Sequence, residues 1–170
     1  SMAEVSIIIP TKNRQDLLNL SIKSVINQSY KDWELFIVND STEKILLNQS
    51  DSRIHLVENQ LLPGANGARN TGINLSSGNY IAFLDDDDTW NSNKLARQVD
   101  IMQSSNSILS YTGKEIIYKK NSILKKKKLT LCRIPSSRKD KVNGCDDLIE
   151  ELCKLNPEFI NGSKSIQRTK

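Results

Sequence analysis

Four consecutive aspartates, Asp85 to Asp88, follow directly on a short apolar run at residues 80–84 that predicts a buried strand. Adjacent carboxylates repel one another, and Mg²⁺ or Mn²⁺, which take oxygen ligands and share them with substrate phosphates, would offset that charge. Because alternate residues of an extended turn point the same way, Asp85 and Asp87 could face one ligand while Asp86 faces elsewhere. The simpler interpretation is a solvated acidic loop. The preceding strand disfavours it, because loops after buried strands often carry function.

Two further polar segments contain residues that suit a nucleotide. Asp40 follows a second apolar run and can accept a hydrogen bond from a base or a ribose hydroxyl, although such an acid can also simply cap the next helix. Arg69 lies beside Gly64 and Gly67, whose lack of a side chain lets the backbone approach a ligand closely. An arginine there suits a phosphate. For Arg69 alone, an ordinary surface salt bridge is an equally good interpretation.

The hydrophobic pattern predicts how these segments meet. Short apolar runs predict strands at residues 5–10, 33–38, 54–57 and 80–84. Helical spacing of apolar residues predicts helices at about residues 15–28 and 68–75. This alternation predicts a mostly parallel sheet with helices on both faces. Ligands bind beyond the carboxyl ends of such strands, so the polar groups after three of the strands should share one edge. They are Thr11 and Asn13, Asn39 and Asp40, and Asp85 to Asp88.

The pattern is weaker beyond Trp90. Residues 95–102 predict a helix, residues 108–118 one or two strands, and residues 146–155 a further helix. The stretch up to about residue 141 is rich in lysine, with Lys125 to Lys128 consecutive, and predicts an exposed hairpin or loop. Clustered lysines attract anionic lipid, so this segment could contact the inner face of a membrane. We favour the simpler interpretation of a solvated, flexible loop.

Composition and absent motifs exclude several classes of protein. Hydrophobic residues make up 37% and charged residues 26% of the 170 residues, which fits one soluble domain. No apolar run approaches the ~20 residues that a membrane-spanning helix needs. The cysteines are widely spaced and form no C-x-x-C pair, and no signal-peptide pattern is present, so we expect a cytoplasmic protein with reduced thiols.

Three further kinds of site lack their sequence signature. There is no P-loop motif and no G-x-G-x-x-G after the first strand, which argues against a P-loop nucleotidase and a dinucleotide-binding domain. His55, the only histidine, falls within the third predicted strand and is interpreted as structural. This leaves no candidate for a histidine-based triad or a zinc site.

Five segments, in order and in register, resemble family 2 glycosyltransferases of the GT-A fold. They are residues 5–14 (VSIIIPTKNR), 24–30 (SVINQSY), 36–42 (FIVNDST), 67–72 (GARNTG) and 78–90 (GNYIAFLDDDDTW). Together they cover roughly the first hundred residues. The resemblance implies a nucleotide-diphospho-sugar transferase fold, which is Rossmann-like α/β with a mostly parallel sheet flanked by helices. It also implies a UDP- or dTDP-sugar donor and inversion at the anomeric carbon.

The resemblance also implies roles for individual residues. Thr11 and Asp40 would hold the pyrimidine base, and Arg69 would lie near the base or the diphosphate. Asp85 and Asp87 match the family's D-x-D pair, which contacts ribose and a Mn²⁺ or Mg²⁺ cofactor, with Asp87 the preferred metal ligand. The predicted nucleotide-sugar-binding residues are Pro10, Thr11, Asn13, Arg14, Asp40, Gly67, Arg69, Asp85 and Asp86, and the predicted metal ligands are Asp87 and Asp85.

Family members usually continue past the point where this sequence stops. Their catalytic base belongs to a Glu-Asp pair after a Gly-Gly-Phe-like turn, and residues 159–170 resemble the strand before that turn. We therefore expect the base beyond Lys170. Within a single domain at 1–170, residues 3–104 would be the nucleotide-sugar-binding part and residues 105–170 an incomplete start of the acceptor part. Such a chain would bind the donor and transfer sugar poorly or not at all.

Three functions remain open from the sequence. The leading one is an inverting glycosyltransferase of bacterial polysaccharide or glycan biosynthesis, with a saccharide or lipid-linked acceptor. The second is a catalytically silent module that binds the nucleotide sugar. The third, a nucleotidyltransferase, ranks last because such enzymes open with a glycine-rich loop and residues 10–14 contain no glycine. Nucleic acid is not an expected partner, since the lysines have no interleaved aromatic residues on which bases could stack.

Overall fold

A computed structural model describes residues 2–104, 109–117, 123–133 and 167–168. Its centre is a parallel sheet in which β1 (Val5–Thr11) lies between β2 (Trp33–Asn39) and β4 (Tyr80–Phe83). β3 (Ile54–Glu58) pairs in parallel with the outer side of β2. This confirms the four predicted strands, each to within a residue at either end. It also confirms the parallel arrangement on which a shared carboxyl edge depends.

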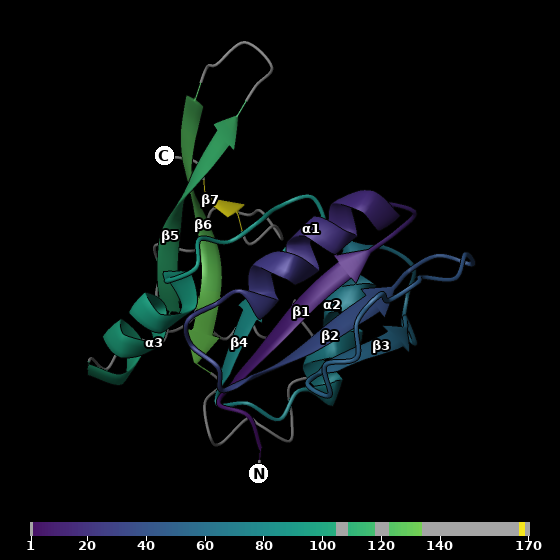
Figure 1. Cartoon of the computed structure of the whole chain (residues 1–170), viewed down its shortest axis with the longest axis horizontal. Helices are drawn as coiled ribbons and strands as arrows, with labels where there is room; N and C mark the ends of the chain where they lie inside the picture. The colour runs from purple at the N-terminus through teal and green to yellow at the C-terminus, as the bar shows by residue number, and fades with distance from the viewer. Residues whose placement is uncertain (1, 105–108, 118–122, 134–166, 169–170) are drawn as a thin grey trace.

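Helices cover both faces of this sheet, as predicted (Figure 1). α1 (Gln15–Ile26) and α3 (Lys94–Ser104) pack on one face, where their apolar side chains form a single core with alternate residues of β1 and β2. α2 (Ala65–Leu75) lies on the other face, against β1 and β2. A Cβ atom at Gly72 would lie 2.6 Å from Cγ2 of Ile8, so this glycine lets α2 approach the sheet closely.

The sheet continues beyond β4 with antiparallel strands, which corrects one prediction. β5 (Leu109–Ile117) and β6 (Ile123–Arg133) form a hairpin, and β6 pairs with β4. Lys125 to Lys128 therefore belong to a strand of a hairpin, so the hairpin alternative for this stretch is confirmed and the favoured interpretation as a flexible loop is wrong. A run of lysines hides the alternation that marks a strand, and all four lysines pair with β5. β7 (Gln167–Arg168) also pairs with β6.

Some sequence predictions fall outside the described residues. These are the helix at residues 146–155 and the strand resemblance at residues 159–170, apart from Gln167 and Arg168. Within the described part, α2 begins three residues earlier than predicted, at Ala65, and His55 lies in β3 with its ring stacked on Phe36. None of the described helices combines the length and the hydropathy that crossing a bilayer requires.

A bidentate ion pair closes the turn that leads into β3. The Arg53 guanidinium donates to both carboxylate oxygens of Asp51, at 3.0 and 2.7 Å, and lies 3.6 Å from the centre of the Trp33 ring. The hydrogen bond from Arg53 holds the pKa of Asp51 below its ordinary value. A carboxylate with a lowered pKa stabilises the fold at neutral pH, and this contribution is lost as the pH falls through that lowered pKa.

Asp51→Asn is therefore expected to reduce the free energy of unfolding at pH 7 by about 1 kcal/mol. The difference from the wild-type protein should shrink as the pH falls below the ordinary aspartate value of about 4. Urea denaturation at a series of pH values measures both effects. Asp100→Asn, at an exposed position of α3, is the matched control. A deficit for Asp51→Asn that stayed constant down to the lowest pH would contradict the interpretation.

Candidate functional site

The polar segments that follow β1, β2 and β4 meet at the carboxyl edge of the parallel sheet. A pocket of about 370 Å³ opens there. Its wall comes from the ends of these strands and from the loop that leads into α2. The lining residues are Pro10, Thr11, Lys12, Arg14, Asp40, Gly64, Ala65, Arg69, Asp85, Asp86 and Asp87. Side chains up to 77 residues apart in the sequence are thus brought to one cavity by the parallel topology.

Two of the predicted site residues, Asn13 and Gly67, do not line this pocket. Asn13 has a φ of 54°, a left-handed conformation that asparagine tolerates better than most residues, and it turns the chain from β1 into α1. At Gly67 an added Cβ would overlap the carbonyl oxygen of Leu62. This glycine thus lets the protein's own loop approach closely, and its contact with a ligand stays a prediction.

Asp86 is not part of the carboxylate group that Asp85, Asp87 and Asp88 form. Its carboxylate is buried and accepts a hydrogen bond of 2.9 Å from the Thr11 hydroxyl. Nη1 of Arg14 lies 3.2 Å from Asp86 and 3.3 Å from Asp87, and so bridges the two carboxylates. The contact with Thr11 ties the acidic turn to the end of β1. Asp86 still lines the pocket, and its contact with the nucleotide stays a prediction.

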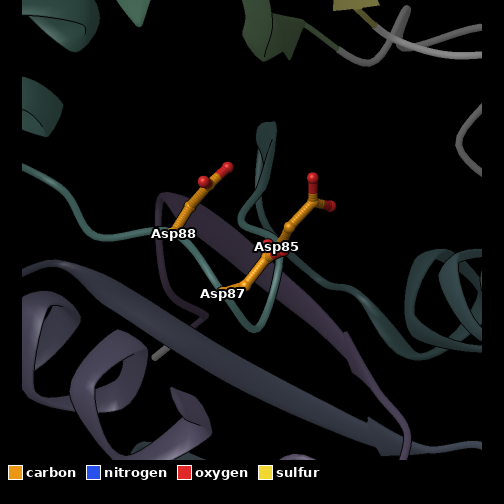
Figure 2. A group of neighbouring side chains, drawn as sticks. All are labelled: Asp85, Asp87 and Asp88. Carbon is orange, nitrogen blue, oxygen red and sulfur yellow. The ribbon is translucent and has the colours of Figure 1, made fainter. Parts of the chain in front are cut away.

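The other three aspartates of the run place their carboxylates together. One oxygen of each of Asp85, Asp87 and Asp88 lies within 4.8 Å of the other two. Figure 2 shows the side chains of Asp85 and Asp88 leaving the turn toward the same side. A hard divalent cation prefers such a set of carboxylate oxygens. These residues therefore fit the metal that the sequence resemblance implies, with Asp88 as an additional candidate ligand.

Sequence reasoning missed Asp88 because strict alternation places it on the opposite side from Asp87. The chain here is a tight turn instead of an extended segment, closed by a hydrogen bond of 3.1 Å from the Asp88 N–H to the Asp85 carbonyl. Such a turn rotates successive side chains out of alternation. The tetrad itself was the available signal, since it includes Asp88, but the geometry of the turn cannot be inferred from four identical residues.

Arg69 supplies positive charge at the inner wall of the pocket. Its Nη2 atom lies 3.1 Å from Oδ1 of Asp85, and both side chains are largely buried. A weaker bond of 3.4 Å joins Nη1 to Asn66. Nε of Arg69 is buried and has no hydrogen-bond partner among the residues that the structure describes. Because a buried N–H donor without a partner is costly, this atom is suited to a ligand oxygen.

Asp40 fixes the loop that forms the opposite wall. Its two carboxylate oxygens accept hydrogen bonds of 2.8 Å from Nδ2 of Asn59 and 2.8 Å from the N–H of Gly64. Asn59 donates in turn to the Leu62 carbonyl. Gly64, which the sequence pattern placed near a ligand, and Ala65, which it did not, reach the pocket through this arrangement. No local signal links Asp40 to Gly64, because 24 residues separate them.

Asp40→Ala should therefore loosen this wall. The substitution removes both acceptors, and we expect a loss of about 1–2 kcal/mol in the free energy of unfolding. We also expect faster hydrogen exchange at the Gly64 amide. Chemical denaturation and amide exchange measure the two effects. Glu43→Ala, at an exposed position three residues away, is the control. Unchanged protection of Gly64 in Asp40→Ala would show that the loop holds itself in place.

Comparison with known proteins identifies the family. The profile of glycosyl transferase family 2 matches residues 6–152, most of the chain. The chain belongs to this family. The matched residues include the strand ends and the acidic turn that line the pocket.

Individual relatives and structures agree with this assignment. The Escherichia coli protein named UDP-Glc:alpha-D-GlcNAc-diphosphoundecaprenol beta-1,3-glucosyltransferase WfgD is 40% identical over 161 residues, covering 90% of this chain and 62% of the relative. The chain thus spans less than two thirds of that relative's length. The crystal structure of S. aureus TarS 1-349 in complex with UDP-GlcNAc has a TM-score of 0.54 at 20% identity, over 62% of this chain and 33% of that chain.

A second solved structure is the mannosyltransferase PcManGT from Pyrobaculum calidifontis in complex with GDP-Man and Mn²⁺. Its TM-score is 0.50 at 19% identity, over 65% of this chain and 35% of that protein. At these identities the two structures show the fold alone. They confirm the predicted GT-A architecture, with its mostly parallel sheet flanked by helices.

Proposed function

We propose that this family 2 glycosyltransferase binds a UDP- or dTDP-sugar in the pocket and transfers the sugar, with inversion, to an acceptor hydroxyl. The observation that carries the proposal is the pocket itself. It joins Arg69, with its free buried Nε donor, to a group of carboxylates at the carboxyl edge of the parallel strands. Both parts suit a sugar nucleotide, since the arginine can bind a phosphate and the carboxylates can hold a cation that shares the phosphate oxygens.

The two ends of the pocket suit different parts of the donor. Pro10, Thr11 and Asp40 form the wall proposed for the base and ribose. The Thr11 hydroxyl donates a hydrogen bond to Asp86, so the oxygen of this hydroxyl would act as a hydrogen-bond acceptor toward a base. Arg14 and Arg69 form the wall proposed for the diphosphate. Both arginines pair with aspartates of the acidic turn, and this pairing holds their guanidinium groups at the pocket.

The proposed metal ligands are Asp87 and Asp85, with Asp88 as a third carboxylate within reach. A bound Mn²⁺ or Mg²⁺ would neutralise the charge that develops on the departing diphosphate. The chain's own contribution is to hold the ligands in place. Arg69 orients Asp85 at 3.1 Å, and the Thr11 hydroxyl holds the Asp86 carboxylate at 2.9 Å. Asp87, half-exposed, is then free to change partners from Arg14 to a cation.

We further propose a saccharide or lipid-linked acceptor and a role in bacterial glycan biosynthesis. The name of the Escherichia coli relative specifies a UDP-Glc donor and a diphosphoundecaprenol-linked acceptor. An acceptor of that kind lies at a membrane, so this chain would work in the cytoplasm, peripherally at the inner membrane face. Lys125 to Lys128 of β6 are the residues that we propose for contact with anionic lipid.

Calorimetric titration of UDP in the presence of Mn²⁺ tests the donor site. We expect binding that weakens by at least tenfold, or about 1.4 kcal/mol, when EDTA replaces Mn²⁺. A parallel titration with dTDP separates the two candidate donors, and GDP serves as the purine control. Absence of binding to UDP and dTDP under every condition would contradict the proposal. Binding without sugar transfer by the whole protein would instead favour the catalytically silent module.

A further inference from the structure

α1 carries polar residues on the side where a helix normally buries apolar ones. Ser21 of this helix is fully buried, and so is Gln28, two residues beyond the helix end at Ile26, whereas Leu17 and Leu20 of the helix are 44% and 56% exposed. Serine favours helix ends and turns over helix interiors, and buried polar groups need hydrogen-bond partners. The helix therefore has a second role besides packing on the core. The hydrogen-bond partners of these buried polar groups show what that role is.

The first contact is between Ser21 and the acidic turn. The Ser21 hydroxyl lies 2.6 Å from the Asp88 carbonyl oxygen, with the Asp85 carbonyl oxygen farther away at 3.3 Å. These two residues are the ends of the turn that the Asp88 N–H closes onto the Asp85 carbonyl. Both backbone carbonyls face Ser21, while the side chains of Asp85 and Asp88 leave the turn toward one side (Figure 2).

Ser24 of the same helix and Gln28, just beyond its C-terminal end, make further contacts along the chain. The Ser24 hydroxyl accepts a hydrogen bond of 3.2 Å from the Trp90 N–H. The Gln28 amide donates to the Asn91 carbonyl at 2.7 Å and accepts from the Leu95 N–H at 3.0 Å. Leu95 lies in the first turn of α3, whose N–H groups have no partner within the helix. Positions 21, 24 and 28 thus bind the backbone from the acidic turn to the start of α3.

We propose that Ser21 is a positioning residue for the cation and diphosphate site, assisted by Ser24 and Gln28. Three carboxylates within 4.8 Å of one another repel, and the turn that carries them must be held from behind. The Ser21 hydroxyl does this from the fully buried side of α1, without contacting a ligand. It acts through the backbone of Asp85 and Asp88. The consequence for ligand binding rests on the proposed function, whereas the hold on the turn does not.

The test compares Ser21→Ala with Ser76→Ala. The Ser76 hydroxyl donates to the Gly72 carbonyl at 2.7 Å, the fourth preceding residue, at the end of α2 and away from the acidic turn. In metal-free protein, amide hydrogen exchange measured by NMR should be about tenfold faster at Asp88 in Ser21→Ala, since one hydrogen bond supports the turn. It should be unchanged at Asp88 in Ser76→Ala.

The second readout is the affinity for UDP with Mn²⁺. The dissociation constant should rise about tenfold in Ser21→Ala and stay within twofold of wild type in Ser76→Ala, as expected for a residue that orients ligands through other groups. If both variants lower the melting temperature equally and Ser21→Ala changes neither the Asp88 exchange nor the UDP affinity, Ser21 is merely structural and the inference is wrong.

Two further outcomes are separable. If Ser21→Ala does not fold, Ser24→Ala replaces it, with faster exchange expected at the Trp90 amide and a smaller loss of UDP affinity. Unchanged exchange at Trp90 would then overturn the inference. If the wild-type protein binds no UDP, the proposed function fails. The exchange of the Asp88 amide still decides whether Ser21 holds the turn.

Discussion

Replacement of Asp87 by alanine is expected to abolish metal-dependent binding of UDP while leaving the metal-free protein at least as stable as the wild type. The two effects have one cause. The Asp87 carboxylate lies within 4.8 Å of those of Asp85 and Asp88, so its removal relieves repulsion when no cation is present. Its pair with Arg14 is half-exposed on both sides, and pairs of that kind contribute little to stability.

Thermal unfolding measures both effects in one experiment. With EDTA, the melting temperature of Asp87→Ala should equal or exceed that of the wild type. With Mn²⁺ and UDP at 100 times the dissociation constant, the wild type should gain about 2.7 kcal/mol, and the variant should gain almost nothing. Asp16→Ala, at an acidic position in the first turn of α1 outside the pocket, is the matched control. Full stabilisation of Asp87→Ala by Mn²⁺ and UDP would exclude Asp87 as a metal ligand.

The parallel sheet and its shared edge could be predicted from the sequence for a simple physical reason. A strand that is buried on both faces is a continuous apolar run, and polar residues mark its end. β1, β2 and β4 follow this rule, with burial throughout β1 and β4. The carboxyl ends of parallel strands coincide, so the polar residues that follow them converge without any information on side-chain contacts. The location of the pocket could therefore be predicted from the sequence, whereas its detailed geometry could not.

Predictions that depend on a local turn or a distant partner were less successful. Asp88 joins Asp85 and Asp87 because a tight turn breaks alternation. The hydrogen bond from the Gly64 amide to the Asp40 carboxylate depends on a contact between separate loops. In α1, Leu17 fits the apolar stripe of the sequence but is exposed, whereas Ser21 is buried against the acidic turn. A periodic pattern shows where apolar residues recur along the chain. It does not show which backbone carbonyls need a hydrogen-bond donor from another element.

The second large effect is expected at Arg69. Nη2 of Arg69 lies 3.1 Å from Asp85 Oδ1, with only 16% and 20% of the two side chains exposed. Arg69→Met would remove the guanidinium 3.1 Å from the partly buried Asp85 carboxylate, at a cost of about 3 kcal/mol in the free energy of unfolding. Urea denaturation measures this cost. The double variant Arg69→Met/Asp85→Asn should recover part of it, because the partly buried negative charge is then gone.

Binding of UDP distinguishes the stabilising role of Arg69 from its role toward the donor. If Arg69 only balances Asp85, the double variant should regain nucleotide affinity together with stability. If its free Nε also donates to a phosphate, as we propose, affinity should stay at least tenfold below wild type in the double variant, a loss of about 1.4 kcal/mol. Arg69→Lys keeps the positive charge but loses the planar guanidinium with its several N–H donors. This variant should therefore be nearer to wild type in stability than in nucleotide affinity. Equal recovery of both quantities would assign Arg69 to the fold alone, and the diphosphate would then depend on Arg14 and the bound cation.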